Sequence, residues 1–336
     1  MPEPARPGSP SLTEGCVRMD KPLVISSSPH LHCGMNTRGI MLDVIIALVP
    51  ALVASVWLFG FRALAVEAVC VGSCLASEIL SRAVMKRPQT VGDLSAVVTG
   101  LLLAFNLPAT IPLWQAALGG VVAIVVAKQM FGGIGQNFVN PALAGRIVLM
   151  GSFPAEMNNW VEPLRWSGAD AVSSATPLAL LSSGGDISTY TKTELLFGMR
   201  PGCLGETCAL ALLLGFVYLV ARRVISPIVP VTFVGTVFVV TWLCGQDPVY
   251  HILSGGLLLG AIFMATDYTT SPVNKAGKVV FAVGCGLLTV LIRLCGSLPE
   301  GVSFAIVIMN ILVPLIERFT RPLPFGEKRR WLRRAK

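Results

Sequence analysis

The chain has 336 residues, of which 54% are hydrophobic and only 13% are charged, and its mean hydropathy is +0.72. Soluble globular proteins do not carry this composition, so it excludes that class and indicates an integral membrane protein. The formal net charge of +8 does not support nucleic-acid binding, because most of the 26 basic residues flank apolar segments, where they determine membrane topology.

The first 38 residues are rich in proline, serine and charge, and they contain no apolar run. They therefore lack the short hydrophobic stretch that defines a secretory signal. We expect residues 1–38 to form a flexible cytoplasmic tail.

Apolar stretches that approach the length needed to cross a bilayer occupy most of the remaining chain. We expect about ten membrane helices, at residues 40–60, 63–82, 94–107, 111–130, 138–153, 203–221, 226–245, 251–268, 279–297 and 302–317. These helices form two blocks of five, residues 39–153 and 203–317, on either side of a polar loop at 154–202. The predicted fold class is an all-α polytopic membrane protein.

Two similar runs indicate that the blocks are repeats. Residues 100–105 (GLLLAF) resemble residues 256–261 (GLLLGA), and each run is followed by a threonine and a proline, at 110–112 and 270–272. Because five is odd, two five-helix repeats would have opposite orientations, as in transporters that bind their ligands at broken helices. We therefore expect an inverted five-plus-five repeat with a broken third helix in each half.

Orientation follows from the basic residues, which remain on the cytoplasmic side in short loops. With both termini inside, the outer side carries only Arg62, Arg165, Lys192 and Arg200, whereas the inner segments carry most of the others, Lys128 included. We expect a multi-pass protein with residues 154–202 on the outer face. Residues 318–336 would form a basic tail that contacts anionic lipid or, as an alternative, a cytoplasmic subunit.

The predicted outer loop contains the sequence DAVSSAT at residues 170–176. This stretch is similar to the acceptor site at which a transferase joins FMN, through its phosphate, to a threonine hydroxyl. Asp170 would serve in recognition, Ser173, Ser174 and Ala175 are small enough to admit the cofactor, and Thr176 would supply an exposed hydroxyl. Ser174 occupies a position where glycine is more usual. The alternative interpretation is a solvated turn before a proline.

Three further segments extend the resemblance along the chain, at residues 128–143 (KQMFGGIGQNFVNPAL), 260–272 (GAIFMATDYTTSP) and 299–310 (PEGVSFAIVIMN). Together with the acceptor motif, and in the same order, they resemble a family of membrane redox proteins. This family contains the D subunit of the Rnf ion-translocating electron transport complex and the B subunit of the sodium-translocating NADH:quinone reductase. The short N-terminal region and residues 28–30 (SPH) favour the Rnf branch.

The resemblance implies a component of an ion-translocating oxidoreductase of the ferredoxin:NAD type in a prokaryotic inner membrane. It implies covalent FMN on Thr176, a noncovalent riboflavin without assignable residues, and a role in coupling electron flow to Na⁺ or H⁺ transport. The implied partners are the A, B, C, E and G subunits of the Rnf complex, and a flavin transferase. We do not expect the chain to be active alone, because its sequence has no iron–sulfur cysteine spacing and no dinucleotide-binding fingerprint.

Ionisable residues inside membrane helices are costly and therefore indicate function by default. Asp267 and Glu206 are the candidates for the ion path, since both lie in family-like motifs. The alternative is that each is solvated near an interface or pairs with an arginine such as Arg146 or Arg293. The nine cysteines and three histidines show no paired spacing, so no metal site is predicted.

Two other functions are compatible with the helices. One is a cofactor-free channel or transporter for a small polar solute, and the other is a structural membrane component that has lost its flavin. Only the redox function explains the acceptor motif at residues 170–176.

Overall fold

The computed structural model describes residues 36–163, 176–178, 191–296 and 301–322. The two tails therefore lie almost entirely outside the described residues. So do Asp170, Ser173, Ser174 and Ala175 of the acceptor motif, whereas Thr176 lies within them.

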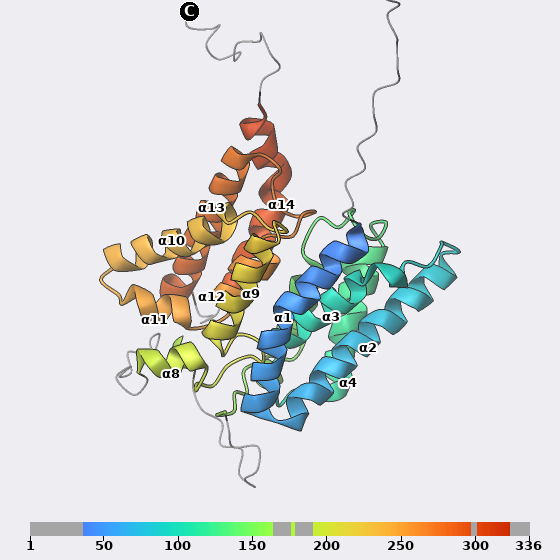
Figure 1. Cartoon of the computed structure of the whole chain (residues 1–336), viewed down its shortest axis with the longest axis horizontal. Coiled ribbons are helices and arrows are strands. Elements are labelled where there is room, and N and C mark those ends of the chain that lie inside the picture. The colour runs from blue at the N-terminus through green and yellow to red at the C-terminus, as the bar shows by residue number, and fades with distance from the viewer. Residues whose placement is uncertain (1–35, 164–175, 179–190, 297–300, 323–336) are drawn as a thin grey trace, which may run out of the picture. The chain divides into compact units, whose positions relative to one another are not determined.

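The first half of the chain is helical throughout its apolar segments (Figure 1). Its elements are α1 (Thr37–Phe59), α2 (Phe61–Val84), η1 (Val91–Asp93), α3 (Ser95–Phe105), α4 (Leu113–Val121), η2 (Val122–Gln129), α5 (Pro141–Ser152) and α6 (Pro154–Met157). Gly60, with φ +70°, ends α1 and allows α2 to begin one residue later. Asn140 begins α5, because its side chain accepts hydrogen bonds from the backbone N–H groups of Ala142 and Leu143.

The second half is also helical in its apolar segments, but its two long helices come last (Figure 1). It contains α8 (Lys192–Phe197), α9 (Ala209–Ala221), α10 (Ile228–Leu243), α11 (Pro248–Leu253), α12 (Leu257–Leu259), η4 (Gly260–Met264), α13 (Lys275–Cys295) and α14 (Val302–Thr320). The predicted 251–268 helix is broken, since residues 254–256 separate α11 from α12. The predicted 94–107 helix is a short helix of 11 residues.

The described residues contain four helices that are long and apolar enough to cross a membrane, namely α1, α2, α13 and α14. Shorter apolar helices are α3, α4 with η2, α9 and α10. Large apolar side chains such as Trp57, Leu80 and Phe319 are exposed on these helices, as expected of surfaces that face lipid rather than water. The prediction of an all-α polytopic membrane protein is confirmed.

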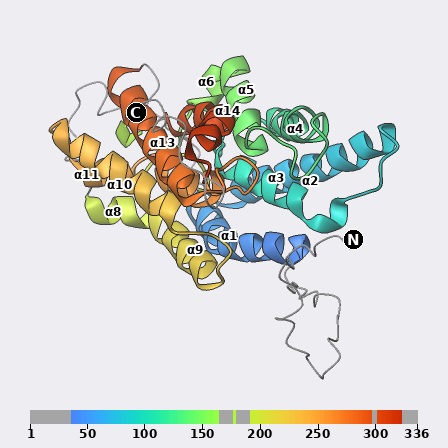
Figure 2. The same cartoon turned by 90° about the horizontal axis from the view of Figure 1, so that it is seen from above.

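The two halves pack their helices in corresponding ways. In the first half α2 contacts α4, and α5 contacts α4 and η2; in the second half α10 contacts α13, and α14 contacts α13. Across the halves α1 packs on α9, and α5 lies beside α14 (Figure 2). The five-plus-five repeat itself stays a prediction.

Two segments, η2 and η4, are π-helical. Their backbone hydrogen bonds reach five residues back, from Met130 N to Val125 O at 3.0 Å and from Ala265 N to Gly260 O at 2.7 Å. π-helical turns are rare in proteins and occur frequently at functional sites. Each half thus contains one segment of a type that is frequent at functional sites.

Candidate functional site

A cavity of about 380 Å³ lies between the two halves of the membrane domain. The first half contributes Ser95, Lys128 and Asn137, and the second contributes Phe263 and Asp267. Both π-helical segments reach this cavity, because Lys128 belongs to η2 and Phe263 to η4. The cavity therefore has mainly apolar walls with a few polar groups, which is the usual character of a small-molecule site.

Asp267 lies on the cavity wall just after η4 and is half-buried. One carboxylate oxygen accepts hydrogen bonds from the hydroxyls of Thr269, at 3.1 Å, and Thr270, at 3.3 Å. The Thr269 hydroxyl also lies 3.0 Å from Asn137 Oδ1. This group presents oxygen atoms from a carboxylate, an amide and two hydroxyls, which is the ligand chemistry that hard cations prefer.

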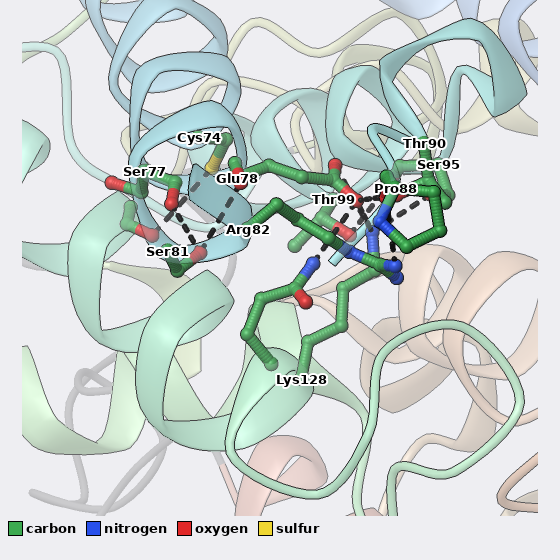
Figure 3. Close-up of polar contacts among 12 residues, drawn as sticks. Cys74, Ser77, Glu78, Ser81, Arg82, Pro88, Thr90, Ser95, Thr99 and Lys128 are labelled. Carbon is green, nitrogen blue, oxygen red and sulfur yellow. Dashed lines mark hydrogen bonds and ion pairs between the residues drawn. The ribbon is translucent and has the colours of Figure 1, made fainter. Parts of the chain in front are cut away.

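A positively charged side chain, Lys128, also lines the cavity. Lys128 is buried and pairs with Glu78 of α2 (Figure 3). Lys128 Nζ lies 3.2 Å and 3.3 Å from the two Glu78 carboxylate oxygens, and it donates to Ser95 Oγ at 2.7 Å. Gln129 Nε2, at 3.1 Å, and Thr90 Oγ1, at 2.9 Å, also donate to Glu78 Oε1. This network joins α2, α3 and η2, and it satisfies both charges within the protein, as a buried ion pair requires.

The burial of Lys128 differs from the expectation drawn from the sequence. We counted it among the cytoplasmic basic residues that determine topology, but its side chain is only 4% exposed. The reason is Glu78, 50 residues earlier in the chain, whose carboxylate compensates the buried ammonium group.

Glu206 lies in a second polar group that centres on Arg146 and does not line the cavity. Glu206 Oε1 accepts a hydrogen bond from Cys203 N at 3.1 Å, and Arg146 donates to Asn106 Oδ1 at 2.6 Å and to Ser303 Oγ at 3.0 Å. Both Glu206 and Arg146 are only 2% exposed. The alternative that Glu206 is solvated near an interface is therefore wrong, and the structure does not bring Glu206 and Asp267 together on one cavity.

Thr176 is buried, with 5% of its surface exposed. The expectation that it presents an exposed hydroxyl is wrong for this conformation. The next two residues, Pro177 and Leu178, are apolar and buried. Because burial of their apolar surface is favourable, the adjacent Thr176 is buried as well.

Sequence reasoning missed the asparagines of the site, Asn106, Asn137 and Asn140. Asn106 binds Arg146, and Asn140 donates to Met264 O at 3.4 Å, so each connects segments far apart in the chain. A local signal existed only for Asn140, because asparagine followed by proline is a typical start of a helix.

Comparison with known proteins agrees with these features. The model of the family described as "NQR2, RnfD, RnfE family" matches residues 24–326. The chain belongs to this family.

Curated relatives in this family match the chain over nearly its whole length. It is 48% identical to the D subunit of the Na(+)-translocating ferredoxin:NAD(+) oxidoreductase complex of Acetobacterium woodii, over 90% of this chain and 95% of that protein. It is 42% identical to the D subunit of the proton-translocating ferredoxin:NAD(+) oxidoreductase complex of Clostridium ljungdahlii, over 91% and 96%. It is 35% identical to the D subunit of the ion-translocating oxidoreductase complex of Escherichia fergusonii, over 91% and 99%.

Proposed function

We propose that this chain is a membrane component of an Rnf-type, ion-translocating ferredoxin:NAD oxidoreductase complex in a prokaryotic inner membrane. The observation that carries the proposal is its near-full-length similarity to the D subunits of such complexes, at 48% and 42% identity. Within this complex it would transfer electrons and help couple them to the movement of Na⁺ or H⁺. Its partners would be the A, B, C, E and G subunits of the Rnf complex.

The proposed electron carrier is FMN joined through its phosphate to Thr176 by a flavin transferase. Support comes from the acceptor sequence at residues 170–176. Thr176 is only 5% exposed, so this proposal requires its hydroxyl to become accessible to the transferase.

A noncovalent riboflavin is proposed for the cavity between the halves. Its volume of about 380 Å³ is in the range of small-molecule sites. Phe263 and Ile262 would pack on a flat ring. A flavin held there would supply one-electron and two-electron transfer within the membrane domain.

The proposed topology places both termini in the cytoplasm and residues 154–202 on the outer face. The burial of Lys128 and Arg82 removes two residues from the inner count, yet the inner segments still carry most of the basic residues. In this orientation Asp267 lies towards the inner side and Glu206 towards the outer side. We retain both as the proposed ion-path residues.

A second candidate function is a cofactor-free transporter for a small polar solute. The burial of Thr176 and the paired halves around a cavity favour it. It leaves the acceptor sequence without an explanation.

The test is to produce the chain with its partner subunits and an active flavin transferase, and to measure intact mass and in-gel flavin fluorescence. We expect one FMN-phosphoryl addition, mapped to Thr176. Thr176→Val should abolish it because the hydroxyl is lost, and Thr176→Ser should retain it. Thr191→Val, which changes another threonine of the same loop, is the matched control and should remain flavinylated.

Fluorescence that persists on Thr176→Val would refute the assignment of this residue. An unmodified wild-type chain, in cells where the transferase modifies another substrate, would favour the cofactor-free transporter.

A further inference from the structure

Unsatisfied polar atoms gather at the break between α11 and α12. In the part of the chain that the structure describes, both ring nitrogens of His251 and the hydroxyl of Ser254 have no hydrogen-bond partner. His251 is 2% exposed and Ser254 is not exposed at all. The two residues are three positions apart at the end of α11, so their side chains begin on the same face of the chain.

Arg293 of α13 fixes the geometry of this break. Its guanidinium group donates to His251 O at 2.6 Å and to Ser254 O at 3.2 Å. These are carbonyls of the last turn of α11, which a helix end leaves without intrahelical partners. Gly255, with φ +67°, then turns the chain into α12. The break is therefore a built feature, held from the neighbouring helix.

Three unpaired polar atoms in a buried site are costly. A buried donor or acceptor without a partner loses its hydrogen bonds to water, and lipid offers no replacement. Native proteins satisfy such groups with ordered water when the protein itself does not. The His251 ring and the Ser254 hydroxyl, three positions apart in the chain, together offer the polar atoms that ordered water needs.

We propose that His251 and Ser254 hold ordered water at the α11–α12 break, and that this hydrated site is a step on the path of the coupling ion. The inference rests on the proposed function for the existence of ion transport. It adds a site that includes neither Asp267 nor the cavity between the halves. This water would either relay a proton or form part of the hydration shell of a sodium ion.

The position of the break supports a path rather than an isolated structural water. A Cβ atom added at Gly256 would lie 2.7 Å from Glu206 Oε2, so the carboxylate of this proposed ion-path residue borders the same break. Broken helices in repeated membrane folds are also where transporters place their ion sites. Glu206 therefore lies at the same helix break as His251 and Ser254.

Among the described residues, Glu206 and Arg146 border the break at Gly256, and further charged groups lie nearer His251. Arg293 faces it from α13, and Asp247 lies at the start of α11. Lys192 of α8 pairs with Asp247 at 2.8 Å, and this hydrogen bond holds the pKa of Asp247 below its usual range. Glu194, also on α8, caps the start of its own helix. The other helices packed on α11, which are α10 and α12, contain no ionisable residue in their sequences.

The first half provides a contrast at the corresponding place. There Lys128, from the π-helical end of the fourth segment, contacts Ser95 at the start of α3, as Arg293 contacts Ser254 before α12. In the first half Glu78 accepts from Lys128, Gln129 and Thr90, so the network satisfies its own charges. In the second half, the ring nitrogens of His251 and the hydroxyl of Ser254 have no protein partner among the described residues and would bind water instead.

The first measurement is a high-resolution structure of the assembled wild-type complex. We expect density for ordered water within hydrogen-bond distance of His251 and Ser254 Oγ. A protein side chain that occupies this place, from a partner subunit or from this chain, would overturn the hydrated site.

The second measurement uses the whole complex in proteoliposomes, with electron transfer and the uptake of Na⁺ and of protons recorded together. We expect His251→Ala to lower ion uptake per electron by about tenfold. This is less than the roughly 100-fold that loss of a catalytic proton-transfer group causes. His251→Gln should restore part of it, and Ser254→Ala should also lower it. The matched control is Thr289→Val on α13, which removes a buried hydroxyl that is already satisfied by Cys285 O at 2.8 Å.

Uptake per electron equal to wild type in both His251→Ala and Ser254→Ala would overturn the role in the ion path. If His251→Ala does not assemble, Ser254→Ala, which removes a single hydroxyl, decides the question. A wild-type complex that transfers electrons but moves no ion would refute the proposed coupling and the path together, and the water density would then decide the hydrated site alone.

Discussion

Replacement of Lys128 by methionine tests whether the buried network of Figure 3 stabilises the membrane domain. Methionine keeps the length and apolar stem of lysine but removes the ammonium group. Glu78, whose side chain is 1% exposed, would then be a buried carboxylate with Gln129 and Thr90 as its remaining donors. Removal of one partner from a buried ion pair typically costs about 3–5 kcal/mol.

Because two donors to Glu78 remain, we expect a loss of about 3 kcal/mol in the free energy of unfolding. With about 2.1 cal/mol/K of unfolding entropy per residue over 336 residues, this corresponds to a decrease of about 4 °C in Tm. The double variant Lys128→Met with Glu78→Gln removes both charges, and we expect it to recover most of this loss. The assay is thermal unfolding of the purified complex in detergent.

The matched control is Lys192→Met, which breaks the exposed pair between Lys192 and Asp247. Those side chains are 55% and 39% exposed, so the pair should contribute less than about 1 kcal/mol. Equal Tm shifts for Lys128→Met and Lys192→Met would refute the reasoning. So would a double variant that is no more stable than Lys128→Met alone.

Two further variants test the cavity wall and the start of α5. Asp267→Asn should slow ion uptake in proteoliposomes while covalent flavin stays at the wild-type level, because the change removes a charge from the cavity and leaves Thr176 untouched; unchanged ion dependence would remove Asp267 from the path. Asn140→Ala should lower stability by about 1–2 kcal/mol, because it removes the cap of α5. Asn140→Asp keeps the capping oxygen and should be less destabilised in the same thermal assay, and equal losses would show that the cap does not account for the effect.

The helices could be predicted from the sequence because their cause is local and repeated. Long apolar runs must form helices in a bilayer, and every predicted stretch coincides with a helix or with two or three short helical segments. The break in the second half was also predictable, since Ser254, Gly255 and Gly256 interrupt an apolar run. Only its position within the expected 251–268 helix required the structure.

The polar interior could not be predicted, because its partners are distant in the sequence. Arg146 is 40 residues from Asn106, and Asn140 is 124 residues from Met264. No local pattern identifies such pairs, so Lys128 resembled any other loop lysine. The same limit applies to Thr176, whose seven-residue motif identifies a chemistry but does not determine whether the hydroxyl is accessible.

The π-helical segments η2 and η4 have a mechanical consequence. A π-helical turn holds one residue more than an α-helical turn, so its conversion to α geometry advances all that follows by one position. Such a step rotates the following residues by about 100° and shifts them by about 1.5 Å. Conversion of η2 would rotate Lys128 away from Glu78. Conversion of η4 would rotate Asp267, which lies on the opposite wall of the cavity. Each wall of the cavity thus contains a joint that can change which side chain faces inward, without unfolding the helix that carries it.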